Sequence, residues 1–133
     1  MSELQGQPAG PAVMPGKVKA IGWLHLFGGI SNLCWAGFWT LYGGVGGILT
    51  FGVGLIFCCP VFILLPVACL ELYSAYIHLG PGGRGQGGPR ITSFAEICTI
   101  TVCNTFSVIP GILTLMFQSD PEVKAWYAEN QDR

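Results

Sequence analysis

The chain has 133 residues, of which 51% are hydrophobic and 10% are charged, and its formal net charge at pH 7 is −1. Soluble domains carry about 25% charged residues, so this composition excludes an ordinary soluble domain, and the charge excludes a basic surface for nucleic acid. The length allows one domain. Between Ile21 and Leu79 the only Asp, Glu, Lys or Arg is Glu71. These features predict an integral membrane protein.

The amino-terminal part divides into a tail and a first apolar segment. Residues 1–16 are rich in Gly, Pro, Ala and Gln and lack hydrophobic periodicity, so they predict a disordered tail rather than a cleavable signal. The segment from about 18 to 42 is long enough to cross a hydrocarbon core of ~30 Å. Trp23 near one end, and Trp39 and Tyr42 near the other, lie where aromatic belts form. We expect a first transmembrane helix here.

The apolar block from Gly43 to Leu79 decides the expected topology. As one helix it would be ~55 Å long, far more than one crossing needs. Pro60 lacks a backbone donor and disfavours helix at Cys59, so a turn near Cys58-Cys59-Pro60 is expected. The block then predicts spans at about 43–58 and 61–79. The alternative is one long broken or re-entrant segment, which would give three crossings in total.

The carboxyl-terminal part begins with a loop rich in Gly and Pro at residues 80–91, which predicts a flexible aqueous connection. A last span is expected at about 92–117. Residues 119–133 then predict an amphipathic tail on the membrane surface, because Ser119 and Glu122 have capping-box spacing and Trp126 and Tyr127 can anchor it. The expected fold is all-α, with four transmembrane helices as two hairpins, a membrane domain over 17–118 and a short surface helix.

Lysine and arginine counts leave the orientation open. Four crossings with the amino terminus inside place four of the six Lys and Arg residues in the cytoplasm. Three crossings also place four there, with Arg84 and Arg90 in place of Lys124 and Arg133. Length favours four crossings with a cytoplasmic amino terminus.

Glycines are concentrated where the first two predicted helices would meet. Gly43 and Gly47 have GxxxG spacing, and Gly28 and Gly29 lie in the first span. Small residues let helices approach closely in lipid, where the hydrophobic effect no longer drives association. We interpret these glycines as helix-packing positions within one chain; a seam between copies of a homo-oligomer is the alternative.

Intramembrane polar residues are the candidate sites, since such groups are costly in hydrocarbon. Glu71 and Glu96 are expected toward the same membrane face, because the loop at 80–91 joins their helices. One interpretation is a proton or ion site at Glu71, with Glu96, Tyr73 and His78 around it. The favoured interpretation is a hydrogen-bonded clip between helices. The remaining candidates for this polar site are His25, Asn32 and Asn104.

Other polar side chains predict little chemistry. The hydroxyls of Thr99, Thr101, Thr105 and Ser107 can bond back to helix carbonyls. His25 has no second His or Cys at i+3 or i+4, so no metal site is expected, and no cofactor is expected either. The six cysteines lie in apolar stretches and predict buried free thiols.

The last quarter of the chain resembles the ending of a broad group of uncharacterised small bacterial four-span membrane proteins. The matching residues are Ile109-Pro110-Gly111-Ile112-Leu113, Leu115-Met116-Phe117 and Asp120-Pro121-Glu122-Val123, with Tyr127 close behind. The resemblance implies four helices and a bacterial inner membrane, and it brings no established activity. The Gly-rich loop at 80–89 and the pair Cys58-Cys59 have no counterpart in that group.

Two functions are expected from these observations. The first is a structural, accessory or assembly role through helix packing, with the bilayer and a larger membrane protein or a second copy as partners. The alternative is an oligomeric small channel or a proton- or ion-coupled transporter that uses Glu71. An enzyme is not expected, because the sequence shows no nucleophile–base pair near an interface.

Overall fold

The computed structural model describes residues 13–80 and 90–130, and every regular element in these two ranges is helical, as predicted. The elements in chain order are α1 (Gly16–Leu49), the 3-10 helix η1 (Val53–Cys58), α2 (Val61–Leu79), α3 (Arg90–Cys98), the 3-10 helix η2 (Thr99–Val102), α4 (Thr105–Gln118) and α5 (Pro121–Asn130). The predicted tail at 1–16 lies mostly outside the described residues, as does most of the loop at 80–91.

The first helix is longer than the sequence predicted. α1 continues through Gly43 and Gly47 to Leu49, and the chain reverses at residues 50–52 rather than at 58–60. The predicted second span, 43–58, is therefore divided between the end of α1, a turn and η1. The turn is fixed by Thr50, whose hydroxyl donates to Gly46 O and accepts from Gly54 N, and by Gly52 with a left-handed φ of 97°. Pro60 joins η1 to α2 with helical backbone angles instead of reversing the chain.

The predicted last span, 92–117, is a hairpin rather than one straight helix. Cys103 has a left-handed φ of 63°, and Asn104 precedes α4 with non-helical angles, so the chain folds back between η2 and α4. A Cβ added to Gly111 would lie 2.9 Å from Ser93 O. In an unbroken helix these positions would be ~27 Å apart, at 1.5 Å per residue. α3 and α4 therefore pack against each other in antiparallel directions.

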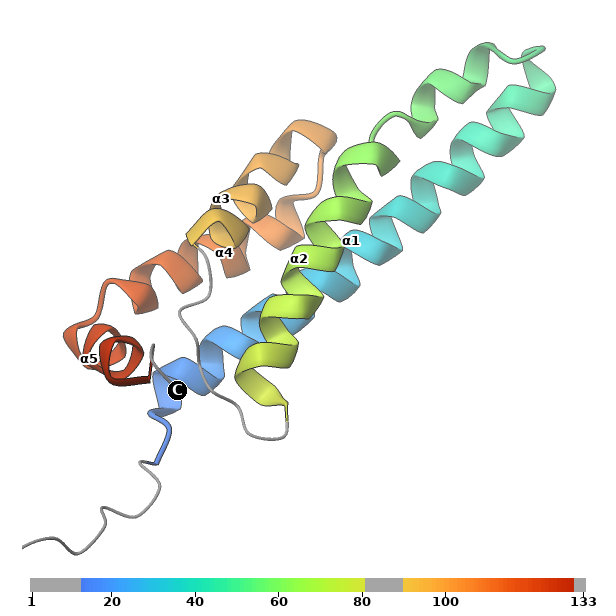
Figure 1. Cartoon of the computed structure of the whole chain (residues 1–133). Coiled ribbons are helices and arrows are strands. Elements are labelled where there is room, and N and C mark those ends of the chain that lie inside the picture. Colours follow the sequence, from blue (N-terminus) through green and yellow to red (C-terminus); the bar gives the residue numbers. More distant parts are fainter. Residues whose placement is uncertain (1–12, 81–89, 131–133) are drawn as a thin grey trace, which may run out of the picture.

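After each of the two reversals, at residues 50–52 and at Cys103, the chain runs back toward the same end of the molecule (Figure 1). There the start of α1 meets α5: Val18, Ile21, Val123 and Trp126 form a buried apolar cluster, and Lys17 Nζ lies 2.5 Å from Asp120 Oδ2. The end of α2 reaches the same end, because Gly22 packs against His78 and Leu79. The tip of the α3–α4 hairpin lies beside the middle of α1, where Asn104 donates to Asn32. The remaining part of α1 extends beyond the hairpin with η1 beside it (Figure 1).

Burial is reversed relative to a protein folded in water. Among the described residues, 14 polar or charged side chains are buried and 10 hydrophobic ones are. Large apolar side chains face outward from every long helix, for example Leu41, Ile48, Phe62, Ile109 and Met116. Within the described residues, one helical stretch is long and apolar enough to span a membrane, and it is Val53–Leu79, which contains η1 and α2.

Candidate functional site: a buried network of glutamates, histidines and amides

The five polar candidates converge on one site although they come from four parts of the chain. His25 and Asn32 lie on α1, Glu71 on α2, Glu96 on α3, and Asn104 at the start of α4. All five are fully buried. The hairpin at Cys103 brings Glu96 and Asn104 back to the same pair of helices, so this convergence depends on the fold of the last segment.

Asn32 is the centre of the amide part of the network. Its side-chain nitrogen donates to Glu71 Oε2 over 2.7 Å and to Ser107 Oγ over 3.0 Å, and its oxygen accepts from Asn104 over 2.6 Å. Ser107 in turn donates to Glu71 Oε1 over 2.9 Å. The expectation that Ser107 bonds back to its own helix is therefore wrong. In the helix predicted over 92–117, the spacing of three residues between Asn104 and Ser107 would place both on one face, and this spacing was the signal for a shared contact.

Glu71 and Glu96 lie side by side against Gly28. A Cβ on Gly28 would lie 2.7 Å from Glu71 Oε1 and 3.3 Å from Glu96 Oε1, so the glycine makes room for both carboxyl groups. Both carboxyl groups therefore face the same space beside α1. A carboxylate can accept but not donate, so a direct hydrogen bond between the two groups would require that the pair holds a proton.

Two histidines extend the network from Glu96 toward α5. His25 Nδ1 lies 2.6 Å from Glu96 Oε1, and the rings of His25 and His78 have centroids 6.2 Å apart. His78 Nδ1 lies 2.7 Å from Ser74 O, a pure acceptor, so this nitrogen carries the proton. Nε2 of His78 then accepts from the hydroxyl of Tyr127 over 3.0 Å. Tyr127 was expected as a surface anchor and is instead part of the network.

Tyr73 does not join the site, in contrast to the expectation that it lies around Glu71. Its side chain is 62% exposed on the outer face of α2. The cysteines differ from expectation as well: all six are free, as expected, but five are exposed and Cys58 is half-buried.

The predicted packing glycines lie on the buried side of α1. Gly28 faces the two glutamates, Gly29 faces Leu72, and Gly47 faces Leu55, each so closely that a Cβ would lie within 3.0 Å of a neighbouring side-chain atom. Gly43 is buried too. Gly37 and Gly44 on the same helix have nothing within 4 Å of an added Cβ. These glycines therefore allow α1 to pack closely against other helices of the same chain.

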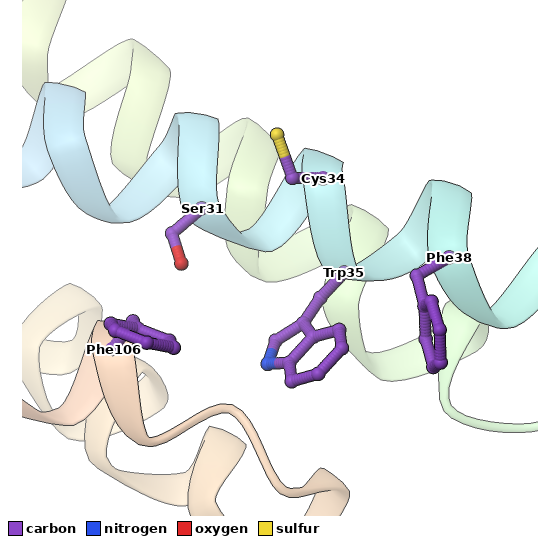
Figure 2. A pocket seen from close by; sticks show the side chains of 5 residues that line it. All are labelled: Ser31, Cys34, Trp35, Phe38 and Phe106. Atoms are coloured by element: carbon purple, nitrogen blue, oxygen red, sulfur yellow. The ribbon is translucent and has the colours of Figure 1, made fainter.

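A cavity of about 320 Å³ lies at the tip of the hairpin, lined by Ser31, Cys34, Trp35, Phe38 and Phe106 (Figure 2). It is separate from the glutamates, and the hydroxyl of Ser31 faces Asn104 Oδ1 over 3.4 Å. The lining offers no carboxylate, imidazole or ammonium group, so this cavity has no arrangement for acid–base chemistry.

The chain matches no family model, no curated protein and no solved structure. Over residues 13–80 and 90–130, no group of three or more His, Cys, Asp and Glu side chains is placed to hold a metal ion.

Proposed function

We propose that this chain is an integral membrane protein that works through helix packing, as a structural, accessory or assembly component of a bacterial inner membrane. The reversed burial carries the proposal. A chain that buries its carboxyls, imidazoles and amides while exposing Leu, Ile, Phe and Met on every long helix is matched to a hydrocarbon solvent, since water would favour the opposite distribution.

The fold supports two crossings and one re-entrant hairpin. α1 is about 51 Å long and exceeds one bilayer core, and the η1–α2 stretch returns beside it. The α3–α4 hairpin enters from the end where α5 lies and turns at Cys103 and Asn104. Non-helical backbone at membrane depth requires protein around it, and Asn104 is buried against α1. The four crossings expected from the sequence are the competing topology.

The positions of the cations support a cytoplasmic amino terminus. The four Lys and Arg residues within the described ranges, Lys17, Lys19, Arg90 and Lys124, all belong to the segments that meet at the α5 end. Cytoplasmic segments carry an excess of Lys and Arg. In the proposed two-crossing topology these four cations would all lie on the cytoplasmic side.

The polar network is proposed as the clip that holds the hairpin. Interhelical hydrogen bonds in membranes contribute ~1 kcal/mol each, and Asn32 alone makes three. The test is Glu71→Gln in liposomes containing the purified full chain. The proposal predicts no proton or ion flux above that of empty liposomes in either protein, and a lower melting temperature for the variant. Flux that disappears in the variant would contradict it.

A second candidate is proton- or ion-coupled transport at Glu71. The observation that favours it is that two buried carboxyl groups lie beside Gly28, with His25 against one of them. An apolar cluster beyond Asn32 argues against a polar path across the whole molecule. It consists of Ala36, Leu64 and Val102, with Trp35, Trp39 and Val61 packed on it. A single copy therefore has polar groups along one part of its length, and transport would need a second copy or a partner.

A further inference from the structure

We propose that Tyr127, His78 and His25 form a proton path from water at the α5 end to the Glu71–Glu96 pair, and that this path is closed beyond Asn32. The pair would then be a proton-binding site that exchanges with one side of the membrane. This inference rests on the membrane embedding proposed above, but not on the presence or absence of transport.

The first observation is the continuity of the buried polar side chains. Tyr127 donates to His78, the ring centroids of His78 and His25 lie 6.2 Å apart, and His25 contacts Glu96, which lies with Glu71 beside Gly28. Tyr127 is partly buried, whereas both histidines and both glutamates are at most 2% exposed. The chain of groups therefore begins at a position that reaches the surface and ends at one that does not.

The second observation is an unused acceptor in the middle of this chain. His25 Nε2 is fully buried and has no hydrogen-bond partner among the described residues. If His25 donates from Nδ1 to Glu96, Nε2 carries a lone pair that is free to take a proton. A purely structural clip has no use for this nitrogen, since burying an acceptor without a partner costs free energy. A relay requires it.

The proton steps balance as follows. Tyr127 gives its hydroxyl proton to Nε2 of His78 and takes one from water. The resulting imidazolium releases its Nδ1 proton, and the proposal requires one water molecule between the rings to carry this proton to Nε2 of His25. His25 gives its Nδ1 proton to Glu96. The acid pair gains one proton, the phenol and both imidazoles become neutral again, and ring rotation restores the starting tautomers.

The groups that face this path are contributed by all five α-helices. They are His25 and Asn32 of α1, Glu71 and His78 of α2, Glu96 of α3, Ser107 of α4 and Tyr127 of α5. Lys17 is engaged by Asp120 and Glu122 at the outer end instead. Burial raises the pKa of Tyr127 to about 12, so its hydroxyl remains protonated at neutral pH and can donate.

The path is closed on the far side by apolar packing. Beyond Asn32 and Asn104, α1 and α2 meet through Ala36 and Leu64, with Val102 of η2 against them. These side chains offer no donor or acceptor. A proton that reaches Glu71 therefore leaves by the route through which it entered.

The test is infrared spectroscopy of the full chain in lipid nanodiscs at neutral pH. The wild type is expected to show a protonated-carboxyl C=O band that weakens in Glu71→Gln. After transfer to D₂O, the shift of this band reports proton exchange. Tyr127→Phe and His25→Gln are expected to slow the shift on the order of a hundredfold, the contribution of a positioned acid–base group.

The matched control is Tyr73→Phe, which removes an exposed hydroxyl from α2 and should exchange at the wild-type rate. Melting temperatures are measured in parallel, because a structural hydrogen bond at Tyr127 would lower stability without slowing exchange. Equal or faster exchange in either path variant, or no carboxyl band in the wild type, would overturn the path. Failure of the membrane embedding would be seen separately, as water-soluble protein that does not enter nanodiscs.

Discussion

Gly111 provides a direct test of the hairpin between α3 and α4. In Gly111→Ala the new Cβ would lie 2.9 Å from Ser93 O and 2.9 Å from Glu96 Cβ. Both are atoms that cannot move without the backbone of α3. Overpacking of this kind costs about 1–3 kcal/mol. Replacing a helical glycine by alanine also stabilises by roughly 0.5–1 kcal/mol, so the net loss for Gly111→Ala is smaller than the overpacking term.

Gly37→Ala separates these two contributions. Nothing lies within 4 Å of a Cβ at Gly37, so this variant should gain only the helix-propensity term. The difference between the two variants is then about 1–3 kcal/mol, because the propensity terms cancel. The assay is unfolding of detergent-solubilised protein followed by circular dichroism. If α3 and α4 formed one straight helix, position 111 would be far from Ser93, and equal stability of the two variants would refute the hairpin.

Two further changes test the network and the attachment of α5. Asn32→Leu is expected to destabilise the protein by about 2–3 kcal/mol, because it removes three interhelical hydrogen bonds. The control is Cys34→Ala on the exposed face, which should change the same unfolding transition little. Equal effects of the two variants would contradict the role of Asn32. The Lys17–Asp120 contact lowers the pKa of Asp120 below its ordinary 3.8 and raises the pKa of Lys17 above 10.5. The contribution of this ion pair to the free energy of unfolding is therefore complete between pH 3.8 and pH 10.5, the two ordinary pKa values. It is lost in acid as the pH falls through the lowered pKa of Asp120, and in alkali as the pH rises through the raised pKa of Lys17. Faster amide exchange of residues 121–130 is expected in Lys17→Met at pH 7, and a pH-7 rate equal to that of the wild type would contradict this attachment.

The polar residues of the site could be selected from the sequence because ionisable and amide groups are rare and costly in apolar segments. His25, Asn32, Glu71, Glu96 and Asn104 stand out for that reason alone. Their mutual contacts could not be predicted, since they depend on where the last segment folds back. The same applies to Ser107 and Tyr127, whose residue types also suit a helix hydroxyl and a surface anchor.

The turns were harder to predict than the helices. The first helix was expected to end near Tyr42, but Gly46 and Gly47 pack closely against Gly54 and Leu55 of η1, and α1 continues to Leu49. The break at Cys103 and Asn104 has no Gly or Pro to mark it. Conversely, Pro66 and Pro110 lie inside α2 and α4 without ending them. In these segments tertiary packing outweighs local preference.

The buried polar network also explains why glycine is needed at position 28. The carboxyl groups of Glu71 and Glu96 occupy the space beside Gly28, so a side chain at this position would displace Glu71 from Asn32 and Ser107. This is a constraint of the site rather than of helix packing in general.

Compartment-specific labelling tests the topology most directly. In a cysteine-free background, single cysteines are placed at Phe51, Arg90 and Glu129, which are exposed, and are treated with a membrane-impermeant maleimide from each side. Two crossings with a re-entrant hairpin predict that positions 90 and 129 react from the same side and position 51 from the other. Labelling of 90 and 129 from opposite sides would show that residues 92–117 cross the bilayer, and would contradict the account.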